Sequence, residues 1–347
     1  MKEDCIALLK ELIAVPSVSR DEKAAADLLE HRLKERGLDV NRTGNNLWVC
    51  DSEEDGRPTV LLNAHIDTVK PSDAWTRDPF APVVEDGRLY GLGSNDDGGS
   101  LVALLKAYEE LSGKRQPYRL IYSVTAEEEV SGRGGIDMLL PEIGKIDFGV
   151  IGEPTGMALA VAERGLMVLD CESLGRSGHA AREEGVNAIY VALGDLEWFH
   201  SYRFERNSDF LGAVKMSVTQ INAGTQHNVI PDKCTFVVDV RPNGMYSNLE
   251  VLQIIKNSVK CQVKERSTRI NSSSIDISHP AVRRGMEIGL KTFGSPTTSN
   301  QSLVSFPTVK IGPGDSARSH SADEFIRISE IEEGIKTYVK LLDGLVL

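Results

Sequence analysis

The chain has 347 residues and a formal net charge of −12, from 51 acidic and 39 basic side chains. At about 150 residues per domain, this length favours two domains, or one domain with a large insertion. The acidic balance and the lack of a basic stripe argue against a nucleic-acid-binding protein. No run of about eighteen apolar residues is present, so no membrane-spanning helix is predicted.

The first half of the chain alternates helices with apolar strands. Helical periodicity predicts an opening helix over 6–13, which ends before Pro16, and a second helix over 21–36, which ends at Gly37. The elements expected next are strands over 47–50 and 59–63, a helix over 100–111, a strand over 118–125, a helix over 134–140 and a strand over 148–151. This alternation predicts an α/β fold whose sheet is mostly parallel at its centre.

The pattern changes near residue 163. Segments with one exposed strand face follow at 166–173, 212–222 and 233–241, and helical periodicity appears at 187–198 and 248–259. Two helices on an antiparallel sheet would form an α+β unit of about a hundred residues. We therefore predict a first domain built from residues 1–163 and 277–347, with a second domain inserted at 164–276.

After the insertion the helix–strand alternation resumes. A helix over 281–292, a strand over 308–311 and a closing helix over 330–342 are expected. Ser329 and Glu332 form a capping-box pattern at the start of the closing helix.

The cysteines indicate a reducing compartment. There are five, an odd number, and they are widely spaced without a CxxC pair, which is typical of reduced thiols and not of disulfides or a thiolate zinc site. The first residues lead directly into an amphipathic helix, so no signal peptide is predicted. We therefore expect a cytoplasmic protein.

Two motifs in the first half carry side chains suited to metal binding. His65 ends an apolar strand, and Asp67 two residues later could orient a metal-bound imidazole. Asp96 lies in the glycine-rich segment Gly91–Gly99, directly before a helix. This segment fails the dinucleotide fingerprint because Asp96 stands where the third glycine belongs. Taken singly, His65 is more simply explained as a capping or surface histidine, and a helix cap explains Asp97 in part.

Further ligand-type side chains follow later strands. Ligands in α/β proteins gather where strands end at their carboxyl side. The residues in such places are His65, Asp96, Glu129, Glu153 and His320. Five nitrogen or oxygen donors could hold two divalent ions about 3.5 Å apart. Glu128 would remain as a general base, although the acidic run Glu127–Glu129 alone could be a solvated turn.

This ordered set resembles the M20 family of metallopeptidases and amidohydrolases over essentially the whole chain. The matching elements are the HxD motif at His65–Asp67, the GxGxxD element at Gly91–Asp96, the glutamate pair Glu128-Glu129, the GEPT sequence at Gly152–Thr155 and the late histidine His320. The resemblance implies a catalytic domain with a mixed sheet and a dinuclear metal site. It also implies that the inserted domain is a lid that forms a homodimer.

The resemblance assigns roles to these side chains. His65 and Glu153 would hold one ion, Glu129 and His320 the other, and Asp96 would bridge both. The ions are expected to be Zn²⁺, with Co²⁺ able to substitute. Glu128 would be the general base, and Asp67 belongs to the catalytic set.

The inserted domain carries the remaining implied contacts. His179, in the turn Gly175–His179, matches a histidine that reaches the active site of a partner chain and stabilises the oxyanion. Asn228 and Arg241 match substrate-binding positions, although a turn residue and a surface charge are the plainer explanations. Three more substrate contacts are expected from the later part of the chain: Thr298, Ser299 and Gly312.

Two departures from the family pattern stand out. Met-Lys-Gly often follows the bridging aspartate, whereas this chain has Asp97-Gly98-Gly99, so an anion replaces a cation beside the metals. The late Gly-Thr-Asp type of loop becomes Thr297–Gln301, in which the hydroxyls remain and the acid is absent.

The implied reaction is hydrolysis of an amide on a small N-acyl amino acid. N-acetylornithine or N-succinylornithine is the first choice of substrate, which would place the enzyme in arginine biosynthesis. Succinyl-diaminopimelate, N-acetyl-lysine, N-acetylcitrulline and dipeptides or other aminoacylase substrates are the alternatives. A non-catalytic metal-binding relative is the alternative of another class, and the complete ligand set argues against it.

Overall fold

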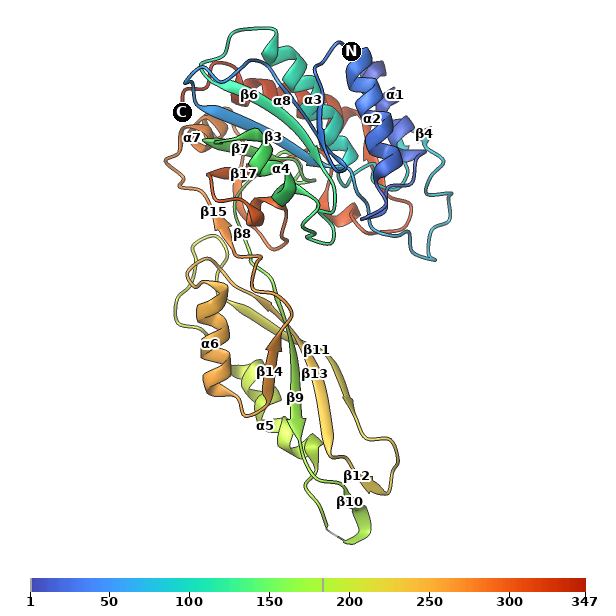
Figure 1. Ribbon diagram of the computed structural model, residues 1–347, viewed down its shortest axis with the longest axis vertical. Coiled ribbons are helices and arrows are strands. Elements are labelled where there is room, and N and C mark those ends of the chain that lie inside the picture. The colour runs from blue at the N-terminus through green and yellow to red at the C-terminus, as the bar shows by residue number, and fades with distance from the viewer. Residues whose placement is uncertain (1, 183) are drawn as a thin grey trace. The chain divides into compact units, whose positions relative to one another are not determined.

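The chain folds into two compact units, each described on its own (Figure 1). The structure is a computed structural model and describes residues 2–182 and 184–347. The first unit consists of Met1–Val161, Ile275–Phe293 and Ser299–Leu347. The second consists of Ala162–Ser274 and Gly294–Thr298. Both junctions of the insertion lie two residues before the expected boundaries at 163 and 276, and 294–298 joins the second unit.

A mixed sheet forms the centre of the first unit. Its strands lie in the order β1 (Asn41–Thr43), β2 (Asn46–Cys50), β6 (Arg119–Thr125), β3 (Thr59–His65), β7 (Phe148–Ile151), β17 (Thr308–Lys310) and β8 (Leu159–Glu163). The four strands from β6 to β17 are parallel, whereas β2 and β8 run antiparallel to their neighbours. The predicted α/β fold with a mostly parallel centre is therefore confirmed.

Helices cover both faces of this sheet. The helices of the first unit are α1 (Lys2–Ile13), α2 (Lys23–Glu35), α3 (Gly98–Ser112), α4 (Ile136–Ile143), α7 (Pro280–Glu287) and α8 (Ile328–Leu342). Alternate residues of β3 point to opposite faces: Val60 and Leu62 pack in the large core with α1, α3 and α8, whereas Leu61 packs with α4. Figure 1 shows α3 and α8 on one face and α4 on the other. None of the described helices is long and apolar enough to cross a bilayer.

A small second sheet in the first unit lies beside the ligand loops. It contains β4 (Val83–Glu85), β5 (Arg88–Tyr90) and β18 (Phe325–Arg327), in the order β18-β5-β4. Sequence periodicity did not predict these strands because each is short and buries at most one side chain. Two short 3₁₀ turns, Asn300–Leu303 and Ser316–Arg318, complete the unit.

Two predictions for the C-terminal part were wrong in detail. The helix expected over 281–292 ends at Glu287, because Gly289 has a φ of +93° and Thr292 already begins β16 (Thr292–Ser295). The capping box does not use Ser329 and Glu332. The helix begins at Ile328, and the Glu330 carboxylate accepts the N–H of Arg327 at 2.9 Å.

The second unit is an α+β domain. Its antiparallel sheet has the order β11 (Lys215–Ala223), β13 (Lys233–Arg241), β9 (Met167–Leu174) and β14 (Gln262–Glu265). Alternate side chains of β9 and β13 are buried with α5 (Ala188–Ser201) and α6 (Asn248–Ser258). A separate two-stranded antiparallel sheet pairs β10 (Gly178–His179) with β12 (Val229–Ile230), and β15 (Ser273–Ser274) pairs with the end of β8. In the described part of the chain the five cysteines are free.

Candidate metal centre

The ends of the parallel strands bring the predicted ligands of the first unit together. His65 ends β3, Glu128 and Glu129 follow β6, and Glu153 follows β7, while Asp96 lies two residues before α3. One ligand atom from each of His65, Asp96 and Glu129 lies within 4.8 Å of the others, and the same holds for His65, Glu128 and Glu153. This is the carboxyl edge of the sheet, where ligands of α/β proteins bind.

The His65 imidazole is oriented by a main-chain carbonyl. Its Nδ1 lies 2.9 Å from the carbonyl oxygen of Asp67 and 3.5 Å from the Asp67 Oδ1 atom. The carboxylate of Asp67 is therefore not the nearest orienting group, which corrects that part of the prediction. The Nε2 atom faces Asp96 Oδ1 at 3.1 Å, so this nitrogen is the one placed to bind an ion.

Asp67 instead holds the segment that carries the glutamate pair. Its carboxylate is fully buried and accepts the N–H groups of Glu128 at 2.9 Å and Glu129 at 3.1 Å. The Ser19 hydroxyl donates to the same carboxylate at 2.7 Å. Burial by itself would raise the pKa of Asp67, but His65 and these donors hold the pKa below its usual value. Asp67 is thus an ionised anchor for Glu128 and Glu129.

Glu128 and Glu127 have different surroundings despite being neighbours. Burial, followed by the charges of Glu129, Asp67 and Asp96, raises the pKa of Glu128 to about 8, and the nearby His65 opposes this shift. The Glu127 carboxylate accepts the N–H of Gly134 at 3.3 Å, and Glu127 has a φ of +55°. Glu127 is therefore engaged with the following turn, and Glu128 is the glutamate that lies with the ligands.

Asp96 lies between two imidazoles. Its Oδ1 atom faces His65, and its Oδ2 atom lies 3.7 Å from His320 Nε2. The same His320 nitrogen is 2.9 and 3.0 Å from the two carboxylate oxygens of Glu129. The hydrogen bond to Glu129 raises the pKa of His320 to about 9. A carboxylate with one oxygen toward each histidine has the arrangement that a bridging ligand requires.

The cluster fits divalent metal ions. Burial raises the pKa of Glu128, Glu129 and Glu153, and in each case neighbouring carboxylates add to the rise. Buried carboxylates this close must be protonated or balanced by cations. Imidazole nitrogens with carboxylate oxygens are donors that suit Zn²⁺ and related ions.

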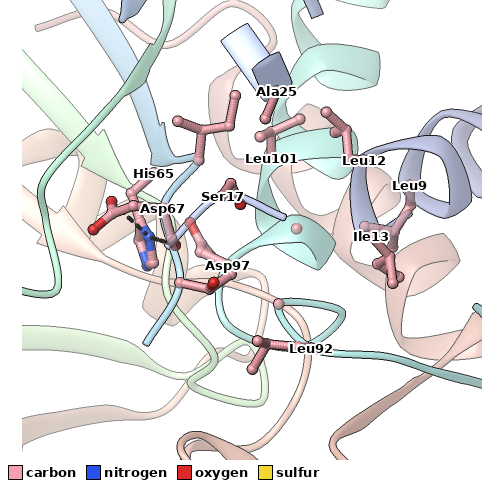
Figure 2. Close-up of a pocket in the computed structure, with 14 residues that line it drawn as sticks. Leu9, Leu12, Ile13, Ser17, Ala25, His65, Asp67, Leu92, Asp97 and Leu101 are labelled. Carbon is pink, nitrogen blue, oxygen red and sulfur yellow. Dashed lines mark hydrogen bonds and ion pairs between the residues drawn. The ribbon is translucent and has the colours of Figure 1, made fainter. Parts of the chain in front are cut away.

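The departure at Asp97-Gly98-Gly99 has a steric explanation. A Cβ atom at Gly98 would overlap the side chain of Leu9 from α1 and the carbonyl oxygen of Gly93, so a lysine does not fit there. Asp97 is buried, and burial raises its pKa to about 7. Figure 2 shows His65, Asp67 and Asp97 lining a cavity of about 20 Å³ together with Leu9 and other side chains. This volume is sufficient for about one water molecule.

The late loop and Gly312 have packing roles at this edge. The Asn300 side chain is buried and donates to Asn63 Oδ1 and Thr125 Oγ1, both at 3.0 Å. It thereby ties the loop to the ends of β3 and β6. Ser299 is also buried, and its hydroxyl accepts the N–H of Gln301 at 3.2 Å. A Cβ atom at Gly312 would overlap the backbone of Glu153. Substrate contacts by Ser299 and Gly312 stay predictions.

The other predicted substrate residues belong to the second unit. His179 is exposed, and its Nδ1 accepts the N–H of Ala181 at 3.1 Å, while the carbonyl of Asn228 accepts the N–H of Ala180 at 3.1 Å. His179 and Asn228 thus lie near each other at the two-stranded β10–β12 sheet. The Arg241 guanidinium is held by Asp239 of its own strand through contacts of 2.7 and 2.9 Å. Thr298 is half-buried at the end of 294–298. Their roles toward substrate stay predictions.

Sequence reasoning missed Glu324. This buried carboxylate accepts three main-chain N–H groups of the loop that carries Asp96. Burial, together with the charge of Asp96, raises the pKa of Glu324 to about 8. In the sequence this residue is recognisable only as an acidic residue four positions after His320. Acidic residues are too frequent for that spacing to indicate a role.

The raised carboxyl pKa values predict how the metal-free protein responds to pH. Glu128 and Glu324 have a pKa of about 8 in the fold against an ordinary 4.5, so the folded chain retains more protons than the unfolded chain between these values. The free energy of unfolding should therefore fall as pH rises through this range. Thermal unfolding of chelator-treated protein at about pH 5.5 and pH 8 measures this, and the decline should shrink when Zn²⁺ is added. A melting temperature that rises with pH in the metal-free state would contradict the burial argument.

Comparisons with known proteins agree with this geometry. The sequence matches peptidase family M20/M25/M40 over residues 61–344. An acetylornithine deacetylase from Buchnera aphidicola subsp. Schizaphis graminum is 27% identical over 97% of this chain and 97% of its own. A succinyl-diaminopimelate desuccinylase from Stenotrophomonas maltophilia is 27% identical over 97% of this chain and 98% of its own.

Solved structures share the fold. The aminopeptidase PepT from Bacillus cereus aligns with a TM-score of 0.79 and 20% identity, covering 99% of this chain and 98% of that one. The Bacillus subtilis YXEP protein, a dinuclear metal-binding peptidase from the M20 family, aligns with a TM-score of 0.70 and 14% identity, covering 98% of this chain and 97% of that one. Because the family match spans most of the sequence, the chain belongs to peptidase family M20/M25/M40, as its ordered motifs predicted.

Proposed function

We propose that this family member is a metal-dependent amidohydrolase that removes the acyl group from a small N-acyl amino acid. The observation that carries the proposal is the position of Glu128. It lies within 4.8 Å of ligand atoms of His65 and Glu153, while Asp67 anchors its main chain. A half-buried carboxylate whose pKa is raised to about 8, beside candidate metal ligands, has the properties of a general base.

The two carboxylate oxygens of Asp96 face different histidines, and the proposed ligands divide accordingly. His65 and Glu153 would hold one ion, Glu129 and His320 the second, and Asp96 would bridge them. When bound, two divalent ions, Zn²⁺ in the first place with Co²⁺ as a substitute, lower the pKa of a water molecule and polarise the scissile carbonyl.

Glu128 performs the proton transfers of the reaction. It takes a proton from the attacking water, whose oxygen bonds to the acyl carbon, and it passes the proton to the amine nitrogen as the C–N bond breaks. The products are a carboxylate and a free amine. His179 would donate to the oxyanion from a second copy of the chain in a homodimer. Asn228 and Arg241 would bind substrate, with Arg241 exchanging Asp239 for the substrate carboxylate.

The acyl group and amino acid are the finer part of the proposal. Our first choice is N-acetylornithine or N-succinylornithine in arginine biosynthesis, supported by an acetylornithine deacetylase among the relatives. A succinyl-diaminopimelate desuccinylase of equal identity supports succinyl-diaminopimelate as the alternative. A succinyl group needs an additional cation in the acyl pocket. Arg318 does not qualify, because both of its terminal nitrogens bind Glu330, at 2.7 and 2.9 Å. Arg176 and Arg182, both exposed, are the remaining arginines considered for this contact.

A small substrate panel tests the proposal. N-acetylornithine, N-succinylornithine, N-acetyl-lysine, N-acetylcitrulline and succinyl-diaminopimelate should be assayed with Zn²⁺ or Co²⁺ present and after chelation. We expect metal-dependent release of a free amine from at least one compound. A protein that binds two ions but hydrolyses none of the panel, dipeptides included, would favour the non-catalytic alternative.

The role of Glu128 predicts a specific loss. Glu128→Gln keeps the size of the side chain but cannot accept the proton of water, so kcat should fall roughly 10²–10⁴-fold while metal stoichiometry is retained. Glu127→Gln is the matched control, because its amide oxygen can still accept the N–H of Gly134, and its kcat should stay near that of the wild type. Equal losses in both variants would remove Glu128 from the mechanism.

The shared active site predicts complementation between chains. Glu128→Gln and His179→Ala should each be nearly inactive alone, the latter by about 10²–10³-fold in kcat, as for an oxyanion-hole donor. If His179 acts across a dimer, a mixed dimer has one intact site and should recover about half of the wild-type activity. Mixed dimers purified with two affinity tags provide the measurement. An inactive mixed dimer, with dimerisation confirmed, would show that the histidine acts within its own chain.

A further inference from the structure

The loops that carry Asp96 and His320 are joined through a pair of strands. Strand β5 leads into the loop of Asp96, and β18 begins directly after Glu324. The two strands pair antiparallel with Tyr90 opposite Phe325, and the N–H of Gly91 donates to the carbonyl of Glu324 at 3.0 Å. This pairing places the start of one ligand loop beside the end of the other.

The side chain of Glu324 then crosses into the loop of Asp96. Its Oε1 atom accepts the N–H groups of Asn95 at 2.8 Å and Asp96 at 2.9 Å, and its Oε2 atom accepts that of Gly93 at 3.0 Å. Glu324 is only 2% exposed. Three N–H groups of one loop are thus bound by one buried side chain, so this contact fixes the backbone of the Asp96 loop.

A second tie lies on the other side of His320. The Asn95 side chain accepts the N–H of Asp315 at 3.0 Å and donates to the carbonyl of Asp315 at 3.1 Å. The segment 315–324 is therefore attached to the Asp96 loop both before and after His320. His320 itself has a φ of +57°, a conformation that a residue other than glycine keeps only where its surroundings impose it.

From these contacts we infer that Glu324 is a positioning residue. It fixes the loop of Asp96 relative to the segment that carries His320, and so fixes the distance between ligands on the two sides of the metal centre. Glu324 binds the main-chain N–H of Asp96 and is not itself a proposed metal ligand. Its effect on metal binding therefore acts through the positions of Asp96 and His320. The inference rests on the proposed function only in taking Asp96 and His320 as ligands.

Glu324→Gln tests this role. The substitution keeps the size of the side chain, but the amide NH₂ cannot accept, so at least one N–H of the Asp96 loop loses its acceptor. We expect Zn²⁺ affinity, measured by calorimetric titration of the chelated protein, to fall about 10- to 100-fold for at least one ion, the effect typical of groups that orient ligands. The visible spectrum of the Co²⁺-loaded protein should change, and high Zn²⁺ should restore part of kcat.

Asp147→Asn is the matched control. Asp147 accepts the N–H of Thr59 at 2.9 Å at the opposite end of β3, so this variant also removes a carboxylate from a main-chain donor, but far along the strand from the ligands. Its metal affinity should equal that of the wild type. Equal weakening in both variants would overturn the inference, as would wild-type affinity and an unchanged Co²⁺ spectrum in Glu324→Gln.

Two further outcomes keep this inference separate from the proposed function. If Glu324→Gln does not fold, Glu324→Asp takes its place: it keeps the charge but is one methylene shorter, so intermediate affinity supports the role and wild-type affinity overturns it. If the wild type binds metal but hydrolyses no substrate, the amidohydrolase proposal fails. The positioning role still stands or falls on the metal titration alone.

Discussion

Four acidic side chains lie close together at the carboxyl edge of the central sheet, where their ionised forms repel one another unless cations are bound. Asp96, Glu128, Glu129 and Glu153 converge there because β3, β6 and β7 are parallel and end together. Their mutual repulsion and burial raise the pKa of the three glutamates. Divalent cations would relieve this repulsion, so the stability of the first unit and the proposed chemistry would depend on the same ions.

The crowded carboxylates keep their places because other carboxylates are tied to the main chain around them. Asp67 accepts the N–H groups of Glu128 and Glu129, and Glu324 accepts those of Gly93, Asn95 and Asp96. In both cases a buried acid is satisfied by backbone donors and therefore stays clear of the metal positions. This arrangement fixes ligands without adding competing side chains to the site.

The departures from the family pattern also have physical reasons within the first unit. Gly98 is required because α1 packs Leu9 against it, and Asn300 completes a buried network of amide and hydroxyl groups at the ends of β3 and β6. Neither position is therefore a simple indicator of substrate. Substrate contacts by side chains of the second unit stay predictions.

The sequence alone determined the fold class, the inserted unit and the candidate ligands, because apolar periodicity and polar residues at strand ends are local patterns. His65, Asp96 and Glu153 could be chosen since each follows a strand or a glycine turn. The tertiary structure decided what depends on contacts between distant segments. Only folding could show that Asp67 anchors the glutamate pair, that Glu127 is engaged elsewhere and that Glu324 serves the loop of Asp96. The contacts of Asp67 and Glu324 are hydrogen bonds across 61 and 228 residues, and that of Glu127 spans seven residues across an irregular turn. Apolar periodicity encodes none of them.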